Sequence, residues 1–464
     1  MTRNFALCIL FTVNLVDCIY PIANNQEEIL NLERITIAGG VPLQGEVCVS
    51  GSKNAALAIM AGAVLASEPV ILHNLPRITD IYTMMAMLRR LGTVVEFIHP
   101  RSLLIDASHI SHLEAPHNLV TRMRASFSVT GPLVTRFGFA RVPLPGGCDI
   151  GARPVDFHIK GLRLLGARVE MDGDFVTAEA TRLKGNTIYL DYPSAGATQH
   201  LMTAAVLAEG TTVIENAAEE PEVVDLANFL ITLGARIEGH GTRRITIEGV
   251  PRLHGGEYTI VPDRLEAATY AIAAAMTRGN VTLTNANPEH MTPVLLKLQE
   301  AGVQIETDEA GVHVQLRGRP KAVNIKTMPH PGFPTDTQQP MTALLCVAEG
   351  VSIVTETVYE RRFRYVEELK KMGADIEQEN RTAVVRGVEK LYGATVQATD
   401  LRAGAALVIA GLGAEGETTI ENIYHIDRGY EDLVAKMQSL GAQILRASDE
   451  PVLASAQEVS VCSV

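Results

Sequence analysis

One short stretch of the sequence, residues 144–154, places a thiol where it could react. Cys148 lies there among three glycines, and Arg153 follows five residues later. Glycine loses the most conformational entropy in a helix or strand, and proline lacks a backbone donor, so the stretch predicts a loop. Backbone N–H groups and a neighbouring cation are surroundings that favour a reactive cysteine. An ordinary turn with an unreactive cysteine fits this stretch alone equally well.

A second group of candidate residues, most of them polar, recurs at one position of a repeated pattern. Counting back fourteen residues from the ends of the Ala- and Leu-rich segments reaches Asn54 (beside Lys53), Arg124, Gly196, Leu265, Asp336 and Arg402. Each polar residue alone has an ordinary explanation: a solvated lysine, a structural ion pair or a helix cap. Their shared register instead predicts one anion-binding site, because helix N-termini carry unsatisfied N–H groups and a partial positive charge.

The elements that position these residues form a sixfold repeat. The pattern Leu-Gly-Ala-x-Val/Ile-Glu or a variant recurs, with its glycine at positions 92, 166, 234, 302, 373 and 441. A glycine after a periodic apolar run predicts a helix end, and the β-branched residues that follow predict a strand. Each unit therefore reads strand-helix-strand-helix-strand. Because six units of about 70 residues exceed one core, we expect an α/β protein with two lobes of three units and buried helices.

Composition narrows the function classes. The 464 residues carry 40 Lys and Arg against 53 Asp and Glu, and this net charge of −13 argues against nucleic acid or an anionic membrane as the main partner. The six cysteines show no CxxC spacing, so neither a zinc site nor a disulfide framework is implied, and a cytoplasmic protein with reduced thiols is the simplest interpretation.

Both ends of the chain are expected to lie outside the fold. Residues 5–16 are apolar behind Arg3, but Asn14 interrupts the run and no small-x-small cleavage site follows. Residues 1–31 are therefore interpreted as a loosely attached or misassigned extension, with a targeting segment as the alternative, and residues 448–464 as a tail.

Six motifs together resemble the UDP-N-acetylglucosamine enolpyruvyl transferases, within the enolpyruvyl transferase family. They are SGSKNAA (50–56), MRAS (123–126), the PGGC loop through RPVD (145–156), HPGFPTD (330–336), ATDLRA (398–403) and YHIDRGY (424–430). The resemblance runs from about residue 35 to residue 446. It implies a two-domain inside-out α/β barrel that closes on its substrate. The implied boundaries are residues 52–262 for one lobe, and 32–51 with 263–447 for the other.

The resemblance also implies a reaction. The family moves the enolpyruvyl group of phosphoenolpyruvate onto the 3-hydroxyl of UDP-N-acetylglucosamine and releases phosphate, in the first committed step of peptidoglycan precursor synthesis. It needs no metal or organic cofactor. The implied partners are these two small molecules, with no nucleic acid and no stable membrane association. The resemblance further implies a fosfomycin target, because epoxide phosphonates alkylate the family's loop cysteine.

The resemblance implies a role for each residue that matches a family motif. The catalytic set is Cys148 as proton donor, Asp336 as acceptor of the 3-hydroxyl proton, and Lys53 and Arg428. Arg153, Arg402 and Arg362 join the cations around phosphoenolpyruvate. Further substrate-binding residues are Asn54, Arg124, Pro154, Val155, Asp156, Phe157, Tyr192, Pro193, Ser194, Ala195, Gly196, Val358 and Asp400. Acidic residues expected to orient the arginines are Glu220, Asp263 and Asp400.

Tyr192 departs from the family, because a lysine is common there, and a diphosphate contact is thereby in doubt. Two alternatives stay open. One is the sibling 5-enolpyruvylshikimate-3-phosphate synthase type, with the same fold and chemistry. The other is a non-catalytic paralogue that senses phosphoenolpyruvate or UDP-sugars, which predicts a broken set of catalytic residues.

Overall fold

A computed structural model describes residues 33–146, 150 and 155–448 of the chain. The expected N-terminal extension, residues 1–31, lies outside the described residues, as does the expected tail from residue 449 onward. Ser448, which we assigned to the tail, instead ends β23 and pairs with Glu33 of β1.

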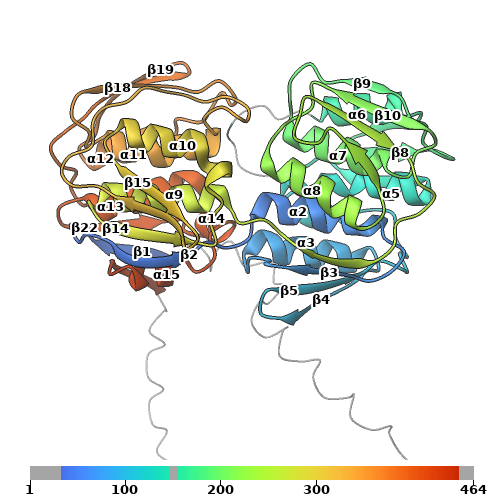
Figure 1. Cartoon of the computed structure of the whole chain (residues 1–464), viewed down its shortest axis with the longest axis horizontal. Helices are drawn as coiled ribbons and strands as arrows, with labels where there is room; N and C mark the ends of the chain where they lie inside the picture. Colours follow the sequence, from blue (N-terminus) through green and yellow to red (C-terminus); the bar gives the residue numbers. More distant parts are fainter. Residues whose placement is uncertain (1–32, 147–149, 151–154, 449–464) are drawn as a thin grey trace, which may run out of the picture.

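Buried hydrophobic residues form two separate clusters, and each is the core of one lobe. The first lobe is built around the cluster drawn from residues 55–260, and the second around the cluster drawn from residues 35–49 and 267–444. Figure 1 shows the two lobes side by side, with strands on the outside and helices within. Two domains of mixed α/β structure are thus present, as the sequence predicts.

The described residues form six sheets, three in each lobe. The first lobe contains β3 (Val70–His73), β4 (Val94–His99), β5 (Ser102–Asp106), β6 (Phe139–Pro143), β7 (Arg168–Asp172), β8 (Phe175–Glu179), β9 (Thr187–Tyr189), β10 (Thr211–Glu215), β11 (Arg236–Glu238), β12 (Arg244–Glu248) and β13 (Gly256–Thr259). The sheet orders are β13-β3-β5-β4, β6-β8-β7 and β11-β12-β10-β9.

The second lobe takes its strands from both ends of the chain. They are β1 (Glu33–Ala38), β2 (Gln44–Cys48), β14 (Asn280–Thr284), β15 (Gln304–Asp308), β16 (Gly311–Gln315), β17 (Ile325–Lys326), β18 (Val351–Thr355), β19 (Asp375–Glu379), β20 (Thr382–Arg386), β21 (Thr395–Gln397), β22 (Glu417–Glu421) and β23 (Gln443–Ser448). The sheet orders are β15-β16-β14-β2, β17-β18-β20-β19 and β21-β22-β1-β23.

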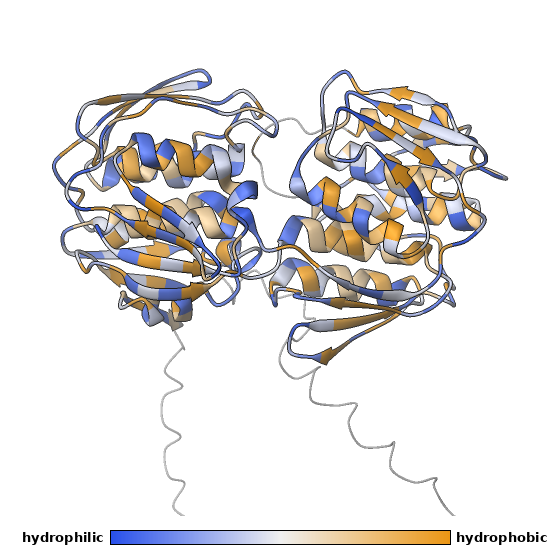
Figure 2. Ribbon diagram, in the orientation of Figure 1, coloured by the Kyte–Doolittle hydropathy of each residue, from blue (hydrophilic) through white to orange (hydrophobic). Residues whose placement is uncertain are grey.

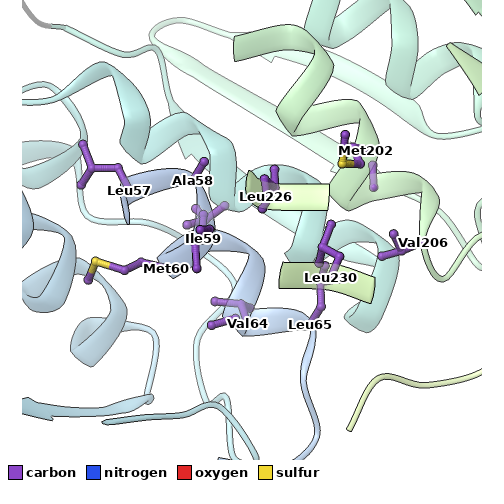
Figure 3. Packing of buried hydrophobic residues seen from close by; sticks show 14 of the residues in the cluster. Leu57, Ala58, Ile59, Met60, Val64, Leu65, Met202, Val206, Leu226 and Leu230 are labelled. Atoms are coloured by element: carbon purple, nitrogen blue, oxygen red, sulfur yellow. The ribbon is translucent and has the colours of Figure 1, made fainter. Parts of the chain in front are cut away.

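One helix of each unit is buried and points its N-terminus toward the other lobe. These inner helices are α2 (Lys53–Gly62), the 3-10 segment η2 (Arg124–Val129) continued by α5 (Thr130–Phe137), α7 (Ala195–Ala205), α9 (Arg264–Met276), α11 (Thr335–Leu345) and α13 (Leu401–Gly413). Figure 2 shows them largely in hydrophobic colours. In Figure 3, Ile59 of α2 lies beside Leu226 of the neighbouring α8.

The second helix of each unit covers the outside of the inner helices and ends where the sequence predicts. These helices are α3 (Thr79–Arg90), α6 (Asp156–Leu164), α8 (Pro221–Thr232), α10 (Pro288–Glu300), α12 (Val366–Lys371) and α15 (Leu433–Ser439); short helices η1 (Ala63–Leu65), α4 (His117–Val120) and α14 (Tyr424–Asp427) complete the set. The repeated glycines that follow all adopt positive φ, from 90° to 103°. Glycine reaches this region without steric cost, so the predicted helix stops are confirmed.

In five of the six described units, two strands follow the outer helix where the sequence pattern indicates one; in the sixth, the single strand β23 pairs with β1 instead. After the outer helix the chain makes an antiparallel hairpin, as in β11 and β12, where Ile237 pairs with Ile247. The second hairpin strand then joins the strand that precedes the outer helix, as β12 joins β10. We read each hairpin as a single strand because the repeated pattern covers only its first half.

The chain crosses between the lobes in two adjacent segments. Gly51 forms an antiparallel bridge with Pro262, and backbone bonds of 2.8 Å join Ser52 N–H to Val261 O and Asp263 N–H to Ser50 O. We call residues 49–52 and 260–263 the crossing pair. It coincides with the boundaries that the sequence suggests, and we propose residues 52–262 and 32–51 with 263–447 as the two domains.

Candidate active site

The six inner helices begin around one cavity. The positions found by the fourteen-residue count, Asn54, Arg124, Gly196, Leu265, Asp336 and Arg402, all line a cavity of about 480 Å³. Three of these helices begin in each lobe, so the cavity lies where the lobes meet. The predicted convergence of helix N-termini is therefore confirmed, and the partial positive charges of these termini make the cavity suited to anions.

One buried carboxylate holds two cations at one end of the cavity. Asp80 lies in the first turn of α3 and is 3% exposed. It receives Lys53 Nζ at 2.7 Å and Arg428 Nε at 3.0 Å. Burial acts to raise the pKa of Asp80, but the charges of Lys53 and Arg428 outweigh it and hold the pKa below its ordinary value. Because Arg428 belongs to the second lobe, this ion pair also joins the lobes.

A second carboxylate, Asp336, is held by two guanidinium groups at the start of α11. Arg362 donates to Asp336 Oδ1 at 2.7 Å, and Arg402 approaches Oδ2 at 3.3 Å. Burial lowers the pKa of both arginines, but in each case nearby groups, Asp336 among them, raise it above the ordinary value. Tyr430 OH accepts from Arg402 at 3.0 Å and so fixes the other edge of the fork. Asp336 stays 27% exposed and can meet a ligand.

Two aspartates cap inner helices and so position these cations. Asp263 accepts from the backbone N–H groups of Leu265 and Glu266, and its second oxygen accepts from Lys53 N–H at 3.0 Å. Asp400 caps α13 in the same way and also accepts from Gln339 Nε2 at 2.9 Å. Asp400 lines the cavity, whereas Asp263 lies behind its lining. Both act on the arginine and lysine positions through the backbone.

Most residues expected to bind the sugar nucleotide line the same cavity. They are Asn54, Arg124, Val155, Asp156, Phe157, Tyr192, Pro193, Ser194, Ala195, Gly196 and Val358. Burial raises the pKa of Tyr192 to about 12, so its hydroxyl is a neutral donor where a lysine would bring charge. Glu220 also lines the cavity, and burial raises its pKa.

Cys148, Arg153 and Pro154 lie outside the described residues. The residues described on either side of the cysteine, Pro145 and Ile150, line the cavity. Ile150 O accepts a bond of 3.1 Å from Arg361 N–H of the second lobe.

Sequence reasoning missed three charged residues that line the cavity or hold it together. Asp80 is one, because an acid in the first turn of a helix has an ordinary explanation. The others are Glu222 and Arg264, a buried ion pair of 3.0 Å between the lobes. Arg264 follows Asp263 directly. Its position just after the expected boundary between the lobes was the signal in the sequence that could have identified it. His158 and His200 lie beside this site, and burial lowers the pKa of His200 to about 3.

A sequence model of the family of EPSP synthase (3-phosphoshikimate 1-carboxyvinyltransferase) matches residues 37–437. The chain belongs to this carboxyvinyltransferase family. Among curated carboxyvinyltransferases, UDP-N-acetylglucosamine 1-carboxyvinyltransferase 2 of Carboxydothermus hydrogenoformans is 53% identical over 420 residues, which cover 90% of this chain and 100% of the relative. The UDP-N-acetylglucosamine 1-carboxyvinyltransferase of Citrobacter koseri is 54% identical over 421 residues, with the same coverage.

Solved carboxyvinyltransferase structures agree. The enolpyruvyl transferase NikO from Streptomyces tendae superposes with a TM-score of 0.81 at 28% identity, covering 90% of this chain and 99% of its own. EPSP synthase from Acinetobacter baumannii gives a TM-score of 0.71 at 19% identity, covering 90% and 100%, which shows the shared fold. The fold class that the motifs imply is confirmed. Among the described residues, no helix has the length and apolar character needed to cross a membrane.

Proposed function

We propose that this carboxyvinyltransferase transfers the enolpyruvyl group of phosphoenolpyruvate to the 3-hydroxyl of UDP-N-acetylglucosamine and releases phosphate. The observation that carries the proposal is one cavity whose lining combines four cations, Lys53, Arg124, Arg402 and Arg428, with the carboxylate of Asp336. The choice of acceptor is supported by relatives that bear this activity in their names and match over their whole length. The alternative acceptor is shikimate 3-phosphate. The solved EPSP synthase is only 19% identical to this chain, so its likeness supports the shared fold and not this acceptor.

The cations supply the electrostatic part of the reaction. Phosphoenolpyruvate carries a carboxylate and a phosphate, and guanidinium groups bind both through paired hydrogen bonds. Arg428 and Lys53 meet at Asp80, so two cations from different lobes converge only when the lobes are together. Charge that develops on the departing phosphate is stabilised by groups that are already in place.

The proton transfers require one acid and one base. In the addition step, Cys148 delivers a proton to C3 of phosphoenolpyruvate, the sugar oxygen bonds to C2, and the hydroxyl proton passes to Asp336. In the elimination step, the Cys148 thiolate takes a proton from the new methyl group, the carbon–carbon double bond reforms, and the bond from C2 to the phosphate oxygen breaks as Asp336 returns its proton to the departing phosphate. Asp336 is exposed enough to touch the hydroxyl and is fixed by Arg362 and Arg402.

We further propose a cytoplasmic enzyme of peptidoglycan precursor synthesis, and a target of fosfomycin through Cys148. Tyr192 is proposed to donate its hydroxyl to the diphosphate in place of the family's lysine. These assignments rest on the resemblance and on the neutral hydroxyl of Tyr192 at the cavity wall.

The test is phosphate release from phosphoenolpyruvate by the purified chain. UDP-N-acetylglucosamine and shikimate 3-phosphate are compared as acceptors, each with and without fosfomycin. Release with the sugar nucleotide alone, abolished by the drug, is the expected result. Release with shikimate 3-phosphate instead would overturn the acceptor and retain the chemistry, and release with neither would favour the sensing paralogue.

A further inference from the structure

A buried carboxylate outside the cavity receives donors from three parts of the chain. Glu431 belongs to the second lobe and is 4% exposed. Its Oε1 accepts from the backbone N–H of Arg77 at 2.9 Å, and its Oε2 accepts from Arg101 at 2.8 Å. Both donors belong to the first lobe. The hydroxyl of Ser50, in the crossing pair, donates to Oε2 at 2.7 Å.

The contact of Glu431 is in register with the contact of Arg428. Arg428 lies three residues before Glu431, and Asp80, its partner, lies three residues after Arg77. The segment 428–431 of the second lobe is thus fastened twice to the segment 77–80 of the first lobe. One fastening lies in the cavity and the other lies outside it. A displacement of Glu431 from Arg77 would therefore draw Arg428 away from Asp80.

The crossing pair is tied to the same point. Ser50 also accepts from Lys436 Nζ at 2.6 Å, and Lys436 pairs with Glu266, which accepts from the backbone N–H of Ser50 at 2.8 Å. Glu266 is in the first turn of α9, three residues after the cap Asp263. Glu431 is consequently linked to the segment about which the lobes must turn, as well as to the first lobe itself.

We propose that Glu431 is a positioning residue that sets the register between the lobes, so that Arg428 meets Asp80 and Lys53 in the cavity. It acts through Arg77 and Arg101 of the first lobe and touches no substrate. The inference rests on the proposed function only for the kinetic experiment. The contacts of Glu431 can be measured whether or not the chain turns over substrate. Buried hydrogen bonds to a charged group are worth more than exposed ones, so this contact is strong enough to matter for the register.

The first experiment reads the contact directly. Amide hydrogen exchange is measured on the full chain for wild type, Glu431→Gln, Glu431→Ala and Arg101→Met. The Arg77 amide is expected to be protected in wild type and in Arg101→Met, which keeps its acceptor, and to exchange at least about tenfold faster in Glu431→Ala. Equal protection in wild type and Glu431→Ala would overturn the proposal, whatever the chain catalyses.

The second experiment reads the consequence in the cavity. Glu431→Gln is expected to lower kcat/KM for phosphoenolpyruvate by about tenfold or more, while the KM for the acceptor changes less than about threefold. Glu248→Gln is the matched control, since Glu248 forms an exposed ion pair of the same kind with Arg236 within the first lobe. Unchanged kcat/KM in a folded Glu431→Gln protein would overturn the positioning role.

A double-mutant cycle tests whether Glu431 sets the register between the lobes through Arg101 or only stabilises the fold. Arg101 is 39% exposed, so Arg101→Met should fold normally and produce a smaller loss than Glu431→Gln. If the two residues act through one contact, the double variant should lose no more than Glu431→Gln alone. Additive losses would contradict the proposal. A wild-type chain that turns over neither acceptor would overturn the proposed function. The amide exchange of Arg77 would then be the test of the contact made by Glu431.

Discussion

Asp80 shows how much of the anion site depends on one side chain. It holds Lys53 and Arg428 together in a buried setting, where like charges without a counter-ion repel. The catalytic cations thus owe their geometry to a carboxylate that makes no proposed contact with substrate. This residue determines whether the two lobes present one site or two separate halves.

Replacing Asp80 with asparagine should separate these cations. We expect kcat/KM for phosphoenolpyruvate to fall about a hundredfold, because Lys53 and Arg428 lose the partner that aligns them. The pKa of Asp80 lies below its ordinary value of 3.8, so its ion pairs persist above about pH 4 and are lost only as pH falls through the lower folded value. The loss in activity should therefore be the same at pH 6 and pH 8. Asp172→Asn, an exposed change in β7, is the control, and an unaltered kcat/KM would contradict this role.

The proposed acid can be tested at Cys148 itself. A Cys148→Asp variant keeps an acidic proton and should retain turnover while resisting fosfomycin, because it offers no thiolate to alkylate. A Cys148→Ser variant should be far weaker, since a hydroxyl is a poor acid. Steady-state rates and mass spectrometry of the drug adduct measure both effects. Full activity in Cys148→Ser would refute the assignment.

At the scale of elements, the six inner helices and their glycine stops explain why distant residues meet. A glycine with positive φ ends each outer helix at the same place, so each unit delivers its inner helix in the same orientation. In four of the six units a polar residue at the helix start then lines the same cavity. Repetition of a local signal, rather than any single motif, builds the site.

Two of these glycines form a matched pair for testing this view. A Cβ added at Gly166 would meet nothing within 4 Å, whereas one at Gly92 would lie 2.5 Å from Ser111 Oγ. Gly166→Ala should therefore cost about 1 kcal/mol of unfolding free energy from the backbone alone. Gly92→Ala should cost clearly more, because the contact adds to the backbone cost. Denaturant unfolding measures both, and equal losses would contradict the steric argument.

A buried carboxyl in α8 predicts a pH effect on stability. Asp225 accepts from Tyr258 OH at 2.6 Å, and burial raises its pKa from 3.8 to about 6. Below pH 4 it is protonated whether the chain is folded or unfolded, and above pH 6 it is ionised in both, which disfavours the folded state. Stability should therefore fall by about 3 kcal/mol as pH rises from 4 to 6. The difference between wild type and Asp225→Asn, measured by denaturant unfolding at several pH values, should show this slope, and a flat difference would contradict it.

Local patterns predicted the helix stops, the inner-helix register and the cations, because each signal lies within one unit. They could not predict Asp80 or Glu431, because one partner of each, Arg428 for Asp80 and Arg101 for Glu431, lies in the other lobe and far away in the sequence. The hairpins were missed for a different reason: the repeated Leu-Gly-Ala-x-Val/Ile-Glu pattern covers only their first strands, although the second strands also bury apolar residues at every other position. Contacts between the lobes and the second strands of the hairpins could therefore not be predicted from the repeated pattern.

At the scale of the whole molecule, the cations of the cavity come from both lobes, and so do the contacts at Glu222–Arg264 and Asp80–Arg428. We therefore propose that the lobes close on the substrate. We expect UDP-N-acetylglucosamine to reduce the radius of gyration in small-angle scattering, because its proposed site includes Asn54 of one lobe and Asp336 of the other. Shikimate 3-phosphate is the control ligand. Scattering profiles that the sugar nucleotide leaves unchanged would contradict closure.

The route of the chain through the two lobes also sets an order of assembly. Residues 52–262 form one continuous stretch and can fold as soon as they leave the ribosome, whereas β1 pairs with β22 and β23 near the other end of the described chain. Pairing over such a separation is slow, and β1 stays an unpaired strand until β22 and β23 are made, whereas β2 can pair earlier with β14. The part of the described chain that is made first is thus the last to find its place.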